Sequence, residues 1–280
     1  MKLNSTKELA LMANAIRADI IRMVNAAKCG HPAGPLGLAE IFSVLFFSEM
    51  DFDPKNPQKE RDIFVLSNGH VCAGSYSAMA HAGYFPPEDL LTFRKFGSPL
   101  QGHPSRKYFP FIDNSSGPLG EGLGIACGYA AALRLDNKPQ RVYCVVSDGE
   151  HDEGSTWEAA LFAAKYKLDN LVAIMDRNYI QIDGTTEDVM PLDSIEEKYR
   201  AFNWNVISID GNDIPQILSA LKQAKDCKGK PTMIIAKTTP GKGVSYMEKN
   251  YKWHGVAPKD EDAAKALSEL AAERKKIEQE

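Results

Sequence analysis

One β-α-β pattern in the middle of the chain restricts the fold more than any other feature. The apolar run 142–146 predicts a buried strand ending at Asp148-Gly149, and a second run, 171–175, ends shortly before Asn178. The residues between the two runs are sufficient for one helix. Parallel strands joined by a helix form a right-handed unit whose strands end at the same edge of the sheet. We therefore predict an α/β fold that brings Asp148 and Asn178 close together.

These two residues carry chemistry that suits a divalent cation. A carboxylate, an amide oxygen and a nearby backbone carbonyl are hard oxygen ligands, which suit Mg2+ or Ca2+ and leave positions for phosphate oxygens and water. The alternative is that Asp148 is an ordinary turn or helix N-cap residue and that Asn178 is a turn residue. The local pattern leaves both interpretations open, and the paired placement proposes a magnesium-diphosphate site.

Further apolar runs extend the pattern over the chain. Additional strands are predicted over residues 63–66, 206–209 and 233–236. Helices are predicted over residues 6–27, 38–47, 120–135, 213–224 and, charged and rich in alanine, about 259–280. Residues 101–116 are rich in turn formers and predict an irregular but ordered loop. This alternation predicts a single domain over residues 1–280, with a parallel sheet covered by helices on both faces.

The composition narrows the class of partner. The net charge of −4 argues against nucleic acid or an anionic membrane as the main partner. The five cysteines are scattered without a CxxC motif, which favours free thiols over disulfides. The sequence contains neither a signal-peptide pattern nor an apolar run long enough to span a bilayer, so we expect a soluble cytoplasmic protein.

Four of the six histidines stand next to glycine: His31, His70, His103 and His254. Each one alone is compatible with a structural or merely exposed side chain. Together they suggest imidazoles that face a ligand, where they can exchange protons near pH 7 and bind hydroxyl groups. A histidine-ligated metallohydrolase is a different class of protein, and it would need a motif such as HExxH, which the sequence lacks. A non-catalytic binding or assembly protein is a third class.

The motif Ser147-Asp148-Gly149-Glu150, together with residues 176–184, resembles the thiamine diphosphate motif of the transketolase family. The family usually has glycine at the position of Ser147. The resemblance continues, in family order, through five short segments: Gly30-His31-Pro32, Leu66-Ser67-Asn68-Gly69-His70, Gly102-His103-Pro104, Gly117-Pro118-Leu119-Gly120 and Trp253-His254-Gly255. It implies the thiamine diphosphate-binding fold and this cofactor.

The resemblance also implies the residues that hold the cofactor. Asp148, Asn178 and the carbonyl of Ile180 are expected to bind the metal, Mg2+ or Ca2+, and the Gly149 amide is expected to meet a diphosphate oxygen. Glycine suits this position because a side chain would keep the phosphate from the backbone. Glu153 is expected to contact a catalytic glutamate of a second domain across a subunit boundary.

Two further groups of contacts follow from the resemblance. The backbone of Gly117, Pro118 and Leu119 is expected to lie against the cofactor, including its aminopyrimidine side. The four histidines are expected to contact the substrate or the cofactor. His31, His103 and His254 line the substrate channel as catalytic residues, with His103 at the donor C1 hydroxyl, while His70 and His254 approach the diphosphate.

The implied function is that of the N-terminal subunit of a split transketolase. Such an enzyme transfers a two-carbon ketol unit from a ketose phosphate to an aldose phosphate, a reaction of pentose phosphate metabolism. The pyrimidine-binding domain that normally follows is not found in this sequence, so we expect an α2β2 heterotetramer with a partner subunit. The alternatives are a split transketolase specialised for an unusual sugar phosphate or sulfo-sugar, a more distant deoxyxylulose-phosphate synthase-like enzyme, and a truncated piece of a longer transketolase.

Overall fold

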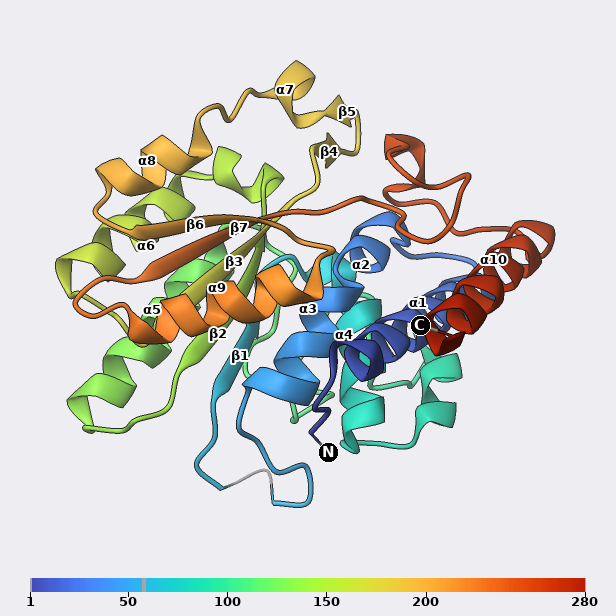
Figure 1. Ribbon diagram of the computed structural model, residues 1–280, viewed down its shortest axis with the longest axis horizontal. Helices are drawn as coiled ribbons and strands as arrows, with labels where there is room; N and C mark the ends of the chain where they lie inside the picture. Colours follow the sequence, from blue (N-terminus) through green and yellow to red (C-terminus); the bar gives the residue numbers. More distant parts are fainter. Residues whose placement is uncertain (1, 57–58, 280) are drawn as a thin grey trace.

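A five-stranded parallel sheet forms the centre of the molecule (Figure 1). The computed structural model describes residues 2–56 and 59–279, so residues 1 and 280, the ends of the predicted domain, lie outside the described part. The strands stand in the order β1-β2-β3-β7-β6, with bounds Ile63–Leu66, Val142–Ser147, Leu171–Arg177, Thr232–Lys237 and Asn205–Asp210. All five predicted strands are confirmed, as is the α/β fold class.

The register of the two central strands fixes where their polar ends meet. In the β2–β3 pair, Ser147 stands opposite Asp176. The amide of Asp148 then donates to the Asp176 carbonyl at 3.2 Å, so pairing continues one residue past the strand end. Because β2 and β3 end at paired positions, the segments that follow them lie at the same edge of the sheet, as predicted.

Helices cover both faces of the sheet because strand side chains alternate between two cores. In β2, Val142, Cys144 and Val146 belong to one core, whereas Tyr143 and Val145 belong to the other. The first core contains α5 (Glu121–Leu135), α6 (Gly154–Lys165) and α8 (Ile195–Ala201), and the second contains α1 (Thr6–Ala27), α3 (Ala39–Val44), α4 (Cys72–Ala82) and α9 (Ile214–Asp226).

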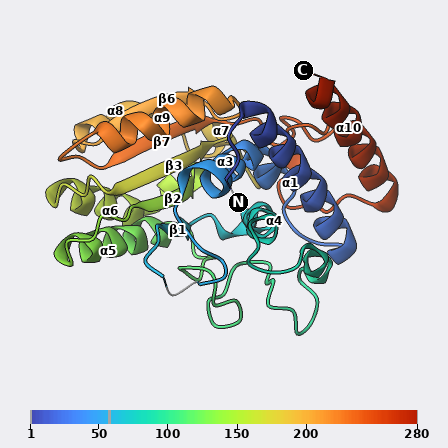
Figure 2. The ribbon, with the colours of Figure 1, turned by 60° about the horizontal axis from the view of Figure 1, so that its bottom comes forward.

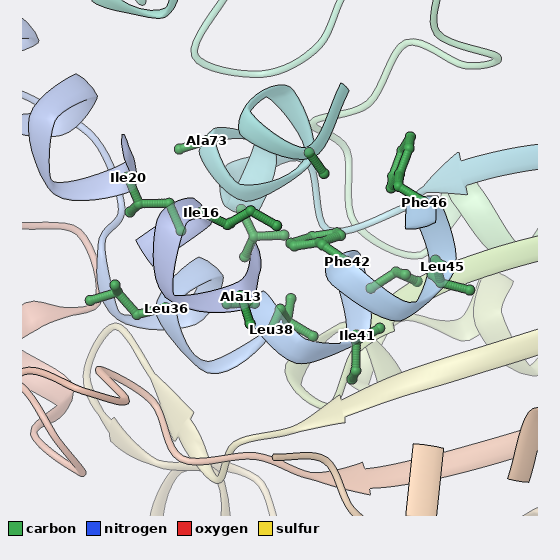
Figure 3. Packing of buried hydrophobic residues seen from close by; sticks show 14 of the residues in the cluster. Ala13, Ile16, Ile20, Leu36, Leu38, Ile41, Phe42, Leu45, Phe46 and Ala73 are labelled. Atoms are coloured by element: carbon green, nitrogen blue, oxygen red, sulfur yellow. The ribbon is translucent and has the colours of Figure 1, made fainter. Parts of the chain in front are cut away.

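The N-terminal helix α1 starts with a capping box. The Glu8 amide donates to the Ser5 hydroxyl, and the Ser5 amide donates to the Glu8 carboxylate, both at 3.1 Å. Figure 3 shows Ala13, Ile16 and Ile20 of this helix packed towards residues of the next helical segment. The apolar side of α1 is therefore buried in the larger core.

The C-terminal helix α10 (Asp260–Gln279) lies alongside α1 in both views (Figures 1 and 2). The side-chain amide of Asn14 in α1 donates to the Leu270 carbonyl at 3.0 Å. The charged, alanine-rich helix predicted for this region is confirmed over the described residues. None of the helices in the described part combines the length and apolar character needed to cross a bilayer.

The helix predicted over residues 38–47 is divided in two. The α-helix α3 ends at Val44, and a π-helical turn, η1 (Leu45–Glu49), follows it. The Phe47 carbonyl in this turn accepts from the Leu3 amide at 2.8 Å, and the Met50 amide donates to the Leu45 carbonyl at 2.9 Å. The turn thus combines a local bond, from Met50 to Leu45, with a tertiary bond from Leu3, in place of continued α-helical bonding.

The remaining elements are short, and most of them border the carboxyl edge of the sheet. They are α2 (Ala33–Gly37), η2 (Gly69–Val71), η3 (Pro87–Thr92), η4 (Gly149–Asp152), β4 (Ile180–Gln181), β5 (Gly184–Thr185), α7 (Thr186–Val189) and η5 (Tyr251–Trp253). The strands β4 and β5 pair as a small antiparallel hairpin. Residues 101–116 form an irregular loop, as predicted.

Candidate functional site

The polar residues that follow β2 and β3 meet at the carboxyl edge of the sheet. Asp148 is 1% exposed, and its Oδ2 accepts the Tyr179 amide at 2.8 Å. Because Tyr179 directly follows Asn178, this bond brings the two predicted metal-ligand segments together. The Asn178 Oδ1 accepts the Ile180 amide at 2.9 Å, and its Nδ2 donates to Asp176 at 2.8 Å.

Burial governs the charge state of the two aspartates at this edge. It raises the pKa of Asp148 to about 6, against the opposing effect of the Tyr179 amide and the Arg177 guanidinium. Burial also raises the pKa of Asp176 to about 7, and the neighbouring Asp148 charge adds to that rise. An added cation would favour the ionised form of Asp148, because it would offset part of the desolvation cost.

The oxygens of this edge fit a divalent cation. Oδ1 of Asp148 accepts the Gly149 amide at 2.8 Å, and Oδ1 of Asn178 accepts the Ile180 amide. Each of these oxygens has a second lone pair that could serve a metal ion. Within residues 2–56 and 59–279, no three His, Cys, Asp or Glu side chains are grouped as metal ligands. The predicted ligand set consists of one carboxylate, that of Asp148, together with the Asn178 amide oxygen and the Ile180 carbonyl.

A buried arginine, which the sequence analysis missed, completes the surroundings of Asp148. Arg177 is 2% exposed, and its Nη1 lies 3.3 Å from Asp148 Oδ2 and 2.8 Å from the Thr186 hydroxyl. Its Nη2 donates to Glu187, and the guanidinium lies 4.1 Å from the centre of the Tyr179 ring. Arg177 thus connects α7 to the edge of the sheet.

The loop that precedes α5 lies beside both the histidines and the start of α6. At Gly117, whose φ is +149°, a β-carbon would lie 3.7 Å from His103. Gly120 has a φ of +82°, and a β-carbon there would lie 2.7 Å from the Glu153 side chain. Pro118, Leu119 and Glu153 are exposed. The predicted cofactor-contacting backbone and Glu153 are therefore neighbours on an open surface.

Four imidazoles gather into one cluster, although they come from four separate loops. His31 stands at its centre, with ring-centre distances of 5.3 Å to His70, 6.2 Å to His103 and 5.5 Å to His254. His70 and His254 are 5.2 Å apart. The predicted gathering of the four glycine-flanked histidines is thus observed.

These imidazoles are neutral at physiological pH. Burial, with help from His254 and Arg94, lowers the pKa of His31 to about 4. Burial lowers the pKa of His70, His103 and His254 as well, and the Arg94 cation lowers that of His103 further. A neutral ring offers one donor and one acceptor nitrogen, which suits contacts with hydroxyl groups.

Several buried polar atoms around the cluster have no hydrogen-bond partner among the described residues. They are Nδ1 of His31, both side-chain polar atoms of Asn68, Oγ of Ser116 and Nε of Arg94. Unsatisfied buried polar groups are costly and uncommon in proteins. Their concentration beside the histidines fits a polar ligand that supplies the missing partners.

The two other histidines and Lys242 lie in different surroundings. His81 contacts Asp19 at 2.8 Å, and His151 is buried between the Ser147 carbonyl and the Tyr199 hydroxyl. Lys242 lines a groove that is bordered by residues of α1 and α10. The structure therefore does not bring these three residues into the imidazole cluster.

Sequence reasoning also missed Arg94 and Glu150. Arg94 donates to the Gly102 carbonyl at 3.2 Å, next to His103. Glu150 is fully buried and bonds to Ser67 and Ser147. The acidic run that starts at Asp148 was the available signal for Glu150. No sequence signal indicated that the Arg94 backbone adopts a left-handed conformation, with a φ of +61°.

A parallel sheet with polar loops gathered at the carboxyl ends of its strands defines an α/β protein that binds its ligand at that edge. The family described as "Transketolase, thiamine diphosphate binding domain" matches residues 9–278. The chain therefore belongs to the transketolase family, as the part that binds thiamine diphosphate. This result confirms the resemblance and the predicted enzyme class.

Relatives of two lengths match the chain. It is 41% identical over 267 residues to the 6-deoxy-6-sulfo-D-fructose transketolase subunit SqwG of Clostridium sp. (strain MSTE9), covering 95% of this chain and 97% of that one. An apulose-4-phosphate transketolase subunit of Actinobacillus succinogenes is 40% identical, with coverages of 96% and 98%. Human transketolase is 40% identical over 99% of this chain, which spans 44% of the human protein.

Solved structures agree with the fold. Transketolase from Campylobacter jejuni superposes with a TM-score of 0.89 at 35% sequence identity, covering 98% of this chain and 46% of that chain. The chain is thus similar over its length to about half of this enzyme and to nearly all of each of the two shorter relatives.

Proposed function

We propose that this chain is the N-terminal subunit of a two-chain transketolase that depends on thiamine diphosphate and a divalent cation, Mg2+ or Ca2+. The reaction moves a two-carbon ketol unit from a ketose phosphate to an aldose phosphate. The observation that carries the proposal is the convergence of two groups at one edge of the sheet. One is the Asp148–Asn178 oxygen set, and the other is the imidazole cluster.

The oxygen set would hold the cation and, through it, the diphosphate. Asp148, Asn178 and the Ile180 carbonyl supply protein ligands, and the Gly149 amide supplies a hydrogen bond to a phosphate oxygen. A dication between a buried carboxylate and a diphosphate offsets the charge of both. The bound cofactor would supply the nucleophilic carbon, and the backbone of Gly117 to Leu119 would orient it.

The histidines would serve the sugar. His103 is exposed next to Gly117, which suits contact with the donor C1 hydroxyl and proton transfer at that oxygen. His31 and His254 would bind further hydroxyl groups as neutral donors and acceptors. His70 and His254 would also approach the diphosphate.

A partner subunit would supply the pyrimidine-binding domain. Exposed apolar side chains on α5 and α6 support this proposal, because they form a surface that favours association. Those side chains are Ile125, Leu135, Leu161, Phe162 and Tyr166. Glu153 is exposed at the start of α6, where it could meet a partner carboxyl group. An α2β2 assembly would place two such sites at subunit boundaries.

Cofactor titration of the complex with its partner tests the proposal. Wild-type protein should bind thiamine diphosphate only when Mg2+ or Ca2+ is present, and the loaded complex should catalyse ketol transfer. Asp148→Ala removes the anionic ligand, so it should weaken cofactor binding by about tenfold or more. Cofactor affinity that is equal in the Asp148→Ala complex would contradict the proposal.

A specialised donor is a second candidate, favoured by the two relatives of similar length that are named for a sulfo-sugar and for apulose 4-phosphate. We would measure kcat/KM of the complex for 6-deoxy-6-sulfofructose, apulose 4-phosphate, fructose 6-phosphate and xylulose 5-phosphate. A preference of about a hundredfold or more for one of the first two would establish specialisation, since it represents about 2.7 kcal/mol of discrimination.

A further inference from the structure

We propose that Glu150 is a positioning residue that joins the three loops carrying the predicted cofactor contacts. The proposal rests on the cofactor binding proposed above and adds a residue that acts through the protein. Glu150 lies in η4, two residues after Asp148, and its side chain is fully buried. A buried carboxylate is costly unless hydrogen bonds satisfy its oxygens, so its partners reveal its role.

Each oxygen of Glu150 bonds to a different loop. Oε1 accepts the Ser67 hydroxyl at 2.5 Å. Oε2 accepts the Ser147 amide at 2.8 Å and the Ser147 hydroxyl at 3.2 Å. The Ser67 hydroxyl in turn accepts the Gly122 amide, which connects the start of α5 to the same carboxylate. Three separate segments of the chain are thus held by one side chain.

The direction of these bonds requires an acceptor at position 150. The Ser67 Oγ accepts the Gly122 amide at 3.2 Å, so its own hydrogen is available for Glu150. The Ser147 amide can only donate. A carboxylate accepts at both oxygens, whereas a carboxamide has one acceptor oxygen and an NH2 group. Glu150 is therefore matched to donors on both of its oxygens.

The joined segments are those that hold the predicted site. Ser67 lies three residues before His70, and Gly122, whose amide bonds to Ser67, lies three residues after the cofactor-contacting loop 117–119. Ser147 directly precedes Asp148. Their spacing is tight, because a β-carbon at Gly122 would lie 2.4 Å from the Ser67 side chain. A change at Glu150 would therefore shift the imidazole, the cofactor-contacting backbone and the metal ligand relative to one another.

Glu40 provides a matched control, because it is also a buried acid with protein donors. It is 7% exposed and bonds to Arg17 at 2.5 Å and to Asn212 at 2.9 Å. Its partners lie in α1 and in the segment after β6, outside the three loops. A variant at Glu40 reports the general cost of removing a buried carboxylate.

We would measure cofactor affinity by calorimetry, with Mg2+ present, for complexes of the partner with Glu150→Met, Glu150→Gln and Glu40→Gln chains. Glu150→Met should weaken binding by about tenfold or more, since hydrogen bonds to charged groups are lost. Glu150→Gln retains one acceptor and should lose less. Glu40→Gln should lower the melting temperature while cofactor affinity stays within about twofold of wild type.

A double-mutant cycle identifies the connection itself. If the Ser67 bond transmits the effect, Ser67→Ala should weaken cofactor binding, and adding it to Glu150→Met should cost less than the product of the two single effects. Fully multiplicative effects would contradict the connection. Should Glu150→Met fail to fold, the affinities of Ser67→Ala and Glu150→Gln still decide the question.

Hydrogen exchange of the chain without cofactor gives a second, independent measurement. The amides of Gly122 and Ser147 should exchange faster in Glu150→Met than in wild type, and their rates should stay unchanged in Glu40→Gln. Wild-type exchange rates together with wild-type affinity in Glu150→Met would overturn the inference. The proposed function would fail separately, through wild-type cofactor affinity in Asp148→Ala.

Discussion

At the scale of single residues, the site depends on polar groups whose charges are set by burial. Burial lowers the pKa of all four imidazoles, and the nearby Arg94 cation lowers the pKa of His31 and His103 further, so the neutral form is favoured. Burial acts on Asp148 in the same way, since it disfavours the ionised form, but for an acid this raises the pKa. Neutral donors and acceptors thus stand near a carboxyl group that an added cation would ionise, and the two groups are suited to different parts of a ligand.

The exposed position of His103 leads to a prediction about turnover. His103→Ala should lower the rate of donor cleavage by about a hundredfold or more, because a positioned proton donor or acceptor is lost. Cofactor affinity should stay near wild type, since His103 is expected at the donor C1 hydroxyl and is not among the residues predicted to hold the diphosphate. Stopped-flow measurement of donor cleavage and calorimetry of cofactor binding provide the two values. A normal cleavage rate would remove His103 from the catalytic residues.

The lowered pKa of His31 predicts how stability changes with pH. Its pKa falls from 6.5 to about 4 on folding, so the unfolded chain binds more protons between these values. The contribution of His31 is therefore complete above about pH 6.5 and is lost as the pH falls towards 4. Urea unfolding at pH 7 and pH 5 should show a smaller loss for His31→Gln than for wild type. Equal losses in both proteins would contradict the assigned shift, and the buried aspartates cancel in the difference because both proteins contain them.

At the scale of secondary structure, close packing between α5 and the end of β1 holds two loops of the site in place. Gly122 lies where a β-carbon would meet the Ser67 side chain at 2.4 Å and the Ser67 Cα at 2.6 Å. Gly124 and Gly128 of the same helix have no atom within 4 Å of such a β-carbon among the described residues. A side chain at Gly122 would therefore clash with Ser67, whereas the positions of Gly124 and Gly128 have room for one.

Alanine substitutions in α5 should reveal this difference. Gly122→Ala should destabilise the chain by about 1–3 kcal/mol, because the new methyl group meets backbone as well as side chain. Gly124→Ala should be neutral or stabilising by up to about 1 kcal/mol, since alanine favours a helix interior. Urea unfolding of both variants gives the comparison. A Gly122→Ala chain as stable as the Gly124→Ala chain would contradict the close packing.

The predictability of the elements follows from how local their causes are. The five strands and α1 were predictable because apolar runs and a capping box are written in adjacent residues. The helix α4 was missed because all its residues except His81 are buried, which leaves no polar side to produce a helical period. The grouping of the histidines was suggested by their glycine neighbours and by the motif resemblance. The Glu150 bond to Ser67 joins residues 83 positions apart and left no local pattern.

At the scale of the whole molecule, an apolar surface on α5 and α6 stands beside the predicted cofactor loop. Phe162 of α6 and Tyr166, which directly follows this helix, are 40% and 53% exposed, and their ring centres are 4.5 Å apart. Leu119, in the loop that precedes α5, is 37% exposed. Phe162 lines a groove together with Gly120, Gly124 and Gly128, and Gly120 directly follows Leu119, so a partner bound in this groove would also reach the predicted aminopyrimidine contacts.

A charged residue on this surface should prevent assembly without unfolding the chain. Phe162→Glu should abolish co-purification with a pyrimidine-domain partner, because a carboxylate would be desolvated at the contact. Leu91→Glu is the control, since Leu91 is 48% exposed and lies in η3, outside α5 and α6. Size-exclusion chromatography of co-expressed chains measures assembly, and circular dichroism checks folding. A Phe162→Glu complex as stable as the Leu91→Glu complex would place the interface elsewhere.

The imidazole cluster has a consequence for how hydrogen atoms can be arranged. Each neutral ring carries one hydrogen on either of two nitrogens, so His31, His70, His103 and His254 together admit several tautomeric patterns of equal net charge. When a ring changes its tautomer, the nitrogen that donated a hydrogen bond becomes an acceptor, and the other nitrogen becomes a donor. Successive steps with different hydrogen-bonding needs can thus be served by the same four side chains, while the net charge of the cluster stays unchanged.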